Sequence, residues 1–184
     1  MRVIGGSAKG IQLQAVPGSG TRPISDRVKE AVFNILGDAI IDSRVLDLFA
    51  GTGSVGIEAL SRGAEGAVFV EKHAKATAII RTNLRRTGFQ ARARVVQADV
   101  FKFLAGEPEV FDLIYIAPPQ YEGLWKKTLL TLETSPNWLE PEGLAIVQIF
   151  PKELEPLSLK TLHLVDQRKY GSTLLCFYEP VQVP

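Results

Sequence analysis

The stretch Val45–Gly56 constrains this chain most, because it has the pattern of a buried strand, a glycine turn and the start of a helix. Apolar residues extend to Leu48, and Gly51, Gly53 and Gly56 then fit the pattern G-x-G-x-x-G. Glycines at this spacing let a nucleotide ligand approach the backbone at the N-terminus of the following helix. The stretch therefore predicts an α/β chain with a nucleotide-type site at the end of its first buried strand.

Two acidic residues near this turn narrow the class of ligand. Asp47 lies four residues before the first glycine, and Glu71 ends the next expected strand. A carboxylate so close to the turn repels a pyrophosphate and attracts a cation. The pattern favours S-adenosylmethionine, with its ammonium and sulfonium groups close to Asp47 and its ribose hydroxyls donating to Glu71. The alternative for Glu71 is an exposed strand end, since acids are mostly surface residues.

Length and composition are those of an ordinary globular protein. The chain has 184 residues, of which 46% are hydrophobic and 22% are charged, and this is enough for one compact domain with a sizeable core. One cysteine and two histidines exclude an internal disulfide and argue against a zinc site. No run is long enough for a membrane span, and the first residues do not form a signal peptide. We therefore expect a cytoplasmic monomer with no metal and no membrane partner.

Strand and helix patterns alternate along most of the chain. The expected strands are 45–49, 67–70, 94–98, 111–116 and 144–149, and the expected helices are about 53–62, 73–87, 100–105 and 122–133. Such alternation predicts a parallel sheet with right-handed crossovers. Two further strands, 161–165 and 173–178, are joined by a loop alone and should pair as an antiparallel hairpin. The expected fold class is α/β, with a seven-stranded, mostly parallel sheet whose last strand is antiparallel.

Residues 1–38 are expected to form an extension that precedes the nucleotide-binding domain, residues 39–184. Segments 2–6 and 11–16 predict a short β-hairpin around a turn. Beyond a loop, Ser25 is a good N-cap, and apolar residues at helical spacing then predict an amphipathic helix that ends near residue 38.

Basic residues are unevenly distributed along the chain. Within the extension they outnumber acids, and we expect Arg2, Lys9, Arg22 and Arg27 to contact RNA. The alternative for Arg27 is an ion pair with an acid of its own helix. Residues 72–94 contain seven lysines and arginines and no acid, which is compatible with a nucleic-acid partner but equally with a solvated helix face.

The carboxyl ends of the strands should carry the ligand, as in other open α/β sheets. Asp99 follows the third expected strand, near where an adenine amino group would lie, and it can also cap the short helix after it. Phe49 and Ile57 fit a core position, although Phe49 also lies within the turn. The expected cofactor contacts are Asp47, Phe49, Gly51, Gly53, Glu71, Lys72, Asp99 and Val100.

A proline pair follows the fourth expected strand. Two prolines fix the backbone and remove two donors, which leaves their carbonyls free as acceptors. An exocyclic amine that accepts a methyl group needs such acceptors, and a neighbouring aromatic ring can stack on its base. The alternative is a rigid turn that closes a strand. The expected catalytic residues are Ala117, Pro118, Pro119, Gln120 and Tyr121.

Three blocks of this sequence resemble the bacterial guanine-N2 methyltransferases of small-subunit ribosomal RNA. They are residues 22–34, residues 46–53 and the pair Tyr170-Gly171, and the likeness extends from about Met1 to Glu179. The first block is specific, whereas many methyltransferases share the glycine loop. The resemblance implies a class I, Rossmann-like methyltransferase domain, S-adenosylmethionine as cofactor, and one guanosine of 16S rRNA in an assembled or assembling ribosomal particle as substrate.

The sequence departs from this family at one motif. The family has Asp/Asn-Pro-Pro-Tyr/Phe after the fourth strand, whereas here Ala117 replaces the acid or amide and Gln120 precedes Tyr121. The carbonyl of Pro118 remains as an acceptor, and Gln120 offers a side-chain oxygen. Two alternative functions stay open. Ala117 favours an RNA-binding or ribosome-assembly protein that has lost the chemistry, and the glycine pattern favours a nicotinamide-dependent oxidoreductase, which Asp47 argues against.

Overall fold

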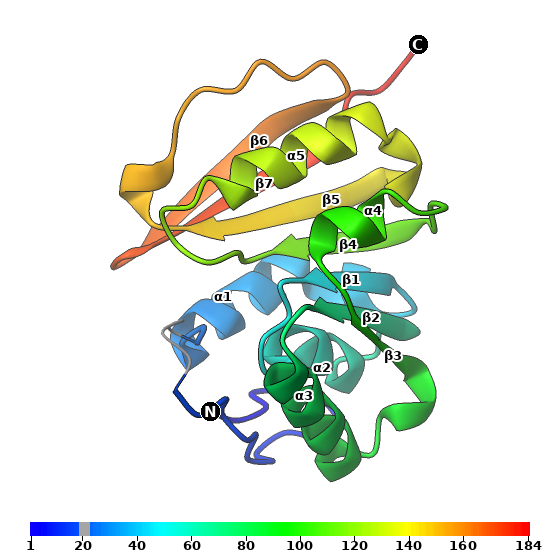
Figure 1. Ribbon diagram of the computed structural model, residues 1–184, viewed down its shortest axis with the longest axis vertical. Helices are drawn as coiled ribbons and strands as arrows, with labels where there is room; N and C mark the ends of the chain where they lie inside the picture. The colour runs from blue at the N-terminus through cyan, green and yellow to red at the C-terminus, as the bar shows by residue number, and fades with distance from the viewer. Residues whose placement is uncertain (19–22) are drawn as a thin grey trace.

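The computed structural model describes residues 1–18 and 23–184 and contains one seven-stranded sheet (Figure 1). The strands are β1 (Arg44–Leu48), β2 (Gly66–Glu71), β3 (Ala93–Gln97), β4 (Phe111–Ile116), β5 (Leu139–Ile149), β6 (Leu162–Tyr170) and β7 (Thr173–Pro180). Their order is β3-β2-β1-β4-β5-β7-β6. The pairs from β3 to β5 are parallel, and β7 is antiparallel to both of its neighbours. The expected mostly parallel sheet with an antiparallel last strand is confirmed.

Helices cover both faces of the sheet. The helices are α1 (Asp26–Leu36), α2 (Ser54–Ser61), α3 (Ala74–Thr87), α4 (Val100–Leu104) and α5 (Leu124–Thr134). Buried residues of α1, α2 and α3 share one core with the sheet, and those of α4 and α5 share a second core on the other face. The central strands β1 and β4 are buried on both faces, which explains their nearly continuous apolar sequences. Within the described ranges, no helix is long and apolar enough to cross a membrane.

Two strands are longer than the sequence pattern indicates. β5 begins at Leu139 rather than at 144. The sequence pattern missed its first residues because Pro141 and Gly143 interrupt the apolar run, at the point where the pairing with β4 shifts register. β6 continues to Tyr170, although most of its side chains are exposed. It is an edge strand with one neighbour, so its polar residues give no alternating signal that would reveal its full length.

The predicted N-terminal β-hairpin is wrong. A single antiparallel bridge joins Arg2 to Gln12, and no strand forms on either side of it within the described residues. The N–H groups of Ile4 and Gly5 donate to the Glu58 carboxylate at 3.0–3.1 Å. These donors therefore bind to α2 rather than to a partner strand, and the segment lies against α2 and α3 (Figure 1).

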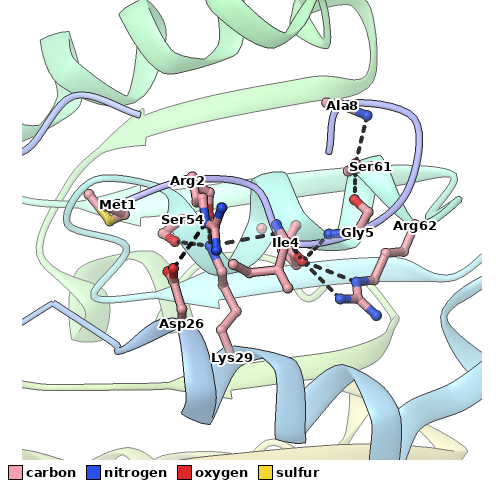
Figure 2. Close-up of polar contacts among 12 residues, drawn as sticks. Met1, Arg2, Ile4, Gly5, Ala8, Asp26, Lys29, Ser54, Ser61 and Arg62 are labelled. Carbon is pink, nitrogen blue, oxygen red and sulfur yellow. Dashed lines mark hydrogen bonds and ion pairs between the residues drawn. The ribbon is translucent and has the colours of Figure 1, made fainter. Parts of the chain in front are cut away.

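A buried ionic network joins α1 and the N-terminal segment to α2 (Figure 2). The Lys29 ammonium donates to the carbonyl of Arg2 at 2.6 Å and to the Ser54 hydroxyl at 2.9 Å. It lies 3.7 Å from the Glu58 carboxylate, and the side chains of Lys29 and Glu58 are only 1% and 0% exposed. Burial lowers the pKa of Lys29, and the charge of Glu58 opposes this. Lys29 of α1 thus supports the first turn of α2 through its bond to Ser54.

Candidate active site

A cleft of about 1340 Å³ opens at the carboxyl ends of β1, β2, β4 and β5. Every expected cofactor residue except Gly53 lines this cleft, and so do all five residues of the expected catalytic motif. The cofactor residues follow β1, β2 and β3, the catalytic motif follows β4, and the topology brings them together because β1 and β4 are neighbours in the sheet. The lining also includes residues that the sequence did not single out, among them Phe101, Tyr115, Gln148 and Phe150.

The glycine turn has the backbone conformation that its sequence requires. Gly53 is the N-cap of α2 with φ = +79°, a left-handed value that favours glycine. Gly56 lies inside the helix, where a Cβ atom would come within 2.3 Å of the Phe69 ring. Phe49 also has a positive φ, +58°, and its half-buried side chain faces the cleft. Of the two residues expected in the core, Ile57 is fully buried and Phe49 is not.

Asp47 is a buried carboxylate at the inner end of the cleft. Its Oδ2 atom accepts a hydrogen bond from the Gly56 N–H at 3.1 Å, inside α2. Burial raises the pKa of Asp47 to about 8, the hydrogen bond from Gly56 opposes this, and the charge of Glu71 adds to it. A buried acid with a raised pKa is stabilised in its charged form by a cation, so this position suits a positively charged ligand group.

Glu71 is a buried acceptor rather than an exposed strand end. The residue is only 8% exposed to solvent. One carboxylate oxygen accepts from the Gly51 N–H at 2.9 Å, and the other accepts from the His73 N–H at 3.0 Å. Because a carboxylate offers about four lone-pair positions, the two bonds orient the group and leave it able to accept from a ligand.

Asp99 caps the short helix α4, which is one of the two roles expected for it. Its Oδ1 atom accepts from the N–H groups of Phe101 and Lys102 at 2.8 and 3.2 Å. The capped turn places Val100 and Phe101 in the wall of the cleft, where the Phe101 ring makes an edge contact with Phe49. This wall is apolar and aromatic, while Lys72 is exposed beside it.

The loop after β4 carries a stacked aromatic pair. Tyr121 is 66% exposed, has φ = +60°, and stacks on Phe150 with ring centroids 5.3 Å apart. The Glu153 carboxylate accepts from the N–H groups of Tyr121 and Phe150 at 2.8 and 2.9 Å. Glu153 therefore ties the loop after β4 to the loop after β5. Behind the aromatic pair, Pro118 is buried, and Ala117 is half buried.

Two polar residues on the sheet itself were missed by the sequence reasoning. The Tyr115 hydroxyl donates to the Gln148 side-chain oxygen at 2.5 Å. Tyr115 is fully buried, and burial raises the pKa of its hydroxyl well above its ordinary value. A signal for both was present, because each is a polar interruption of an otherwise apolar strand at its carboxyl end.

The four basic residues expected to contact RNA lie in different places. Arg22 is outside the described residues. Arg2 forms an exposed ion pair with Asp26 at 3.2 Å, and Lys9 is exposed. Arg27 lies over the Tyr170 ring at 6.0 Å and lines the cleft, so the alternative that it pairs with an acid of its own helix is wrong for the described part of the chain.

The basic segment 72–94 is divided between free and engaged side chains. Arg94 pairs with Glu109, and Arg92 donates to the carbonyl of Ala64 at 2.7 Å. Arg85 and Arg86 of α3 donate to the Thr82 hydroxyl at 3.1 Å and to the carbonyl of Gln12 at 3.4 Å, while Lys72, Lys75 and Arg81 are exposed along α3 and just before it. Across the described ranges, no group of three His, Cys, Asp or Glu residues could hold a metal ion.

Comparison with known proteins gives a consistent picture. The family model described as Conserved hypothetical protein 95 matches residues 1–179. YlbH of Bacillus subtilis (strain 168), named provisionally as an rRNA methyltransferase, is 39% identical over 183 residues, covering 97% of this chain and 98% of YlbH. Ribosomal RNA small subunit methyltransferase D of Escherichia coli (strain K12) is 38% identical over 148 residues, covering 80% and 74% of the two chains.

A solved structure extends the likeness to three dimensions. The Escherichia coli protein yhhF, named provisionally as a methyltransferase, matches with a TM-score of 0.88 and 34% identity, covering 98% of this chain and 97% of that chain. The seven-stranded order with its antiparallel β7 is thus the class I methyltransferase fold. The chain belongs to the Conserved hypothetical protein 95 family of class I S-adenosylmethionine-dependent methyltransferases.

Proposed function

We propose that this protein methylates the N2 amino group of a guanosine in small-subunit (16S) ribosomal RNA, with S-adenosylmethionine as methyl donor. The observation that carries the proposal is the cleft, in which an acid-flanked glycine turn faces a proline pair beside an exposed aromatic ring. Relatives named as small-subunit rRNA methyltransferases support the choice of substrate.

The residues of the cleft fit the cofactor in charge and hydrogen-bonding capacity. Asp47 is a buried acid whose charged form needs a cation, and the ammonium of S-adenosylmethionine would provide one. Glu71 would accept from the ribose hydroxyls, with Gly51 in the adjoining turn. Asp99, Val100 and the apolar wall beside them would hold the adenine, with Phe49, Gly53 and Lys72 completing the expected cofactor set.

The protein's part in the reaction would be positioning and hydrogen bonding. When bound, S-adenosylmethionine supplies an electrophilic methyl group. The exposed ring of Tyr121 would stack on the target base, and the carbonyl of Pro118 would accept from its N2 amino group, with Pro119 and Gln120 shaping the loop at Ala117. Orientation and preorganised hydrogen bonds of this kind lower a barrier by several kcal/mol.

The N-terminal extension, residues 1–38, would add contacts to the RNA beside the methyltransferase domain, residues 39–184. Arg27 has the strongest position, because it lies over Tyr170 and lines the cleft. Arg2 and Lys9 are also exposed, and Arg22 completes the set proposed from the sequence. Lys29 is excluded from it, because its ammonium is buried. We propose a cytoplasmic monomer acting on an assembled or assembling particle.

A methyl-transfer assay tests this function. The protein is incubated with labelled S-adenosylmethionine and small-subunit particles from a strain that lacks its gene, with particles from the parent strain as control. Label should enter the 16S rRNA of the first sample alone, because the second is already modified. Absence of label from both samples would contradict the proposal.

A second function has one observation in its favour. Ala117 removes the side-chain acceptor that the family resemblance implies, so the chain could bind the particle and have lost the chemistry. Particle binding and cofactor binding without methyl transfer would favour this assembly role. The oxidoreductase alternative is disfavoured by membership of a methyltransferase family, and tight binding of NAD would be needed to revive it.

A further inference from the structure

The missing acceptor at position 117 has a neighbour on the next strand. β4 and β5 pair in parallel, with Tyr115 opposite Ile146 and Ile116 opposite Val147. Continuing this register places Ala117 beside Gln148 at the carboxyl end of β5. Residues opposite one another in a parallel pair direct their side chains to the same face, so Gln148 shares the face of Ala117. Both residues line the cleft.

Tyr115 fixes the orientation of the Gln148 amide. Its hydroxyl donates to the Gln148 side-chain oxygen at 2.5 Å, and the tyrosine is fully buried. An amide oxygen has two lone pairs, so this bond leaves one of them available. Gln148 itself is only half buried and borders the cleft, which lets a ligand reach that oxygen.

We propose that Gln148 supplies, from the neighbouring strand, the side-chain acceptor that Ala117 cannot provide, and that Tyr115 positions it. This rests on the proposed guanine-N2 methylation. In that step the amine nitrogen bonds to the methyl carbon as the carbon–sulfur bond breaks, and the electron pair of that bond stays on sulfur. The neutral amide oxygen orients one N–H of the amine. It takes up no proton, and the released proton passes to water.

The arrangement accounts for an otherwise costly feature of the sheet. A tyrosine hydroxyl buried in a protein core needs a partner, and an apolar residue at 115 would fill the same space without that need. Asp47 faces Tyr115 across β1 and β4, and its charge raises the pKa of Tyr115 further. The hydroxyl therefore stays protonated as a donor, so the Gln148 oxygen is held in one orientation.

Reciprocal substitution at the two positions tests the proposal. The variants are Gln148→Ala, Ala117→Asn and the double variant, with Gln167→Ala on the exposed strand β6 as matched control. Single-turnover methyl transfer is measured on small-subunit particles from a strain lacking the gene, and cofactor affinity by calorimetry. Gln148→Ala should slow transfer by about 100-fold, as removal of one preorganised polar group does in other enzymes.

Recovery of the methyl-transfer rate distinguishes a Gln148 that acts as an acceptor from a Gln148 that only supports the strand. In the double variant, Asn at position 117 should recover at least tenfold of the lost rate, because it returns an amide oxygen to the same face of the sheet. Tyr115→Phe should lower the rate less than Gln148→Ala, and none of these changes should alter cofactor affinity. If Gln148→Ala fails to fold, Gln148→Met replaces it, with similar length and no acceptor.

Two results would overturn the proposal while leaving the proposed function intact. One is transfer by Gln148→Ala at the rate of the unmodified protein. The other is a loss of rate that Ala117→Asn does not restore, which would assign Gln148 to the structure of the strand. Failure of the unmodified protein to transfer any methyl group is a different outcome, and it would refute the proposed function together with this inference.

Discussion

The two halves of the cleft are built differently. In the half proposed for the cofactor, buried acids already bind backbone N–H groups, as Asp47 does with Gly56 and Glu71 with Gly51. In the half proposed for the target base, the main feature is an exposed tyrosine held between two loops by Glu153. The first half is built from motif residues of the loops after β1, β2 and β3, and the second from the loops after β4 and β5, which Glu153 joins.

This difference shows why one motif is regular and the other is altered. The glycine turn cannot change much, because Gly53 has a left-handed φ and a side chain at Gly56 would overlap the Phe69 ring. The loop after β4 has more freedom, since its groups come from several elements. An acceptor lost at Ala117 can be supplied by a residue of β5, and an aromatic ring displaced to Tyr121 can stack on Phe150.

The largest effect is expected behind the cofactor half. Glu58→Ala leaves the buried Lys29 ammonium without its ion-pair partner and removes the acceptor of the Ile4 and Gly5 N–H groups. Breaking one side of a buried pair costs about 3–5 kcal/mol, which urea unfolding measures. Asp26→Ala is the control, because it breaks an exposed pair with Arg2 worth about 0–1 kcal/mol. Equal losses for the two variants would contradict this account of the network.

Glu71→Ala should come next and should weaken cofactor binding. The change removes charge-assisted hydrogen bonds worth about 1.5–3 kcal/mol each, so the affinity for S-adenosylmethionine should fall at least tenfold by calorimetry. Glu65→Ala, an exposed acid just before β2, is the matched control and should bind normally. Unchanged affinity of the Glu71 variant would remove the main support for the proposed ribose contact.

Tyr121→Ala should affect methyl transfer rather than cofactor binding. Loss of a base-stacking ring costs about 1–3 kcal/mol, so methyl transfer to ribosomal particles should slow while cofactor affinity stays the same. Tyr121→Phe keeps the ring and should retain most of the rate. Transfer by the alanine variant as fast as by the unmodified protein would mean that the base stacks elsewhere.

A series of salt concentrations tests whether Arg27 contacts the RNA. Arg27→Ala should weaken particle binding and reduce the slope of log affinity against log salt by about one unit, as expected for one lost phosphate contact. Lys160→Ala, an exposed cation before β6 and outside the cleft lining, serves as the control. A slope identical to that of the unmodified protein would make Arg27 a structural partner of Tyr170.

A further effect concerns the pH dependence of stability. Burial raises the pKa of Asp47 from 3.8 to about 8, so between these values the folded state holds a proton that the unfolded state has lost. The stability of the ligand-free protein should therefore fall as pH rises through this window. Asp47→Asn should remove that slope and stabilise the ligand-free protein at pH 8, while weakening cofactor binding. Thermal unfolding at pH 5 and pH 8 measures it, and an unchanged slope would show that Asp47 is ionised throughout.

Most of the fold could be predicted from the sequence, because strands and helices of this sheet have distinct periods. The course of the N-terminal segment could not, since the N–H groups of Ile4 and Gly5 donate to Glu58, a residue more than fifty positions away. The burial of Lys29 could not be predicted either, because its partner Glu58 lies far away in the sequence. The packing of the N-terminal segment and α1 on α2 decides such contacts.

The residues of the candidate site also fall into a group that local motifs predict and a group that they do not. The residues from Asp47 to Asp99 follow local motifs, and the structure brings all of them except Gly53 into the lining of one cleft. Tyr115, Gln148 and Glu153 follow no motif, because their relation to Ala117 and Tyr121 exists only through the pairing of β4 with β5 and the loops beyond. Polar interruptions in buried strands were the available signal for Tyr115 and Gln148.

If the two halves of the cleft serve one reaction, nucleoside analysis of the modified RNA should identify its product. Small-subunit particles lacking the modification are incubated with the protein and labelled S-adenosylmethionine, and the 16S rRNA is digested and examined by mass spectrometry. We expect N2-methylguanosine at a single position, formed more slowly by Tyr121→Ala at saturating cofactor. A methyl group on any other atom, or none at all despite bound cofactor and particle, would contradict it.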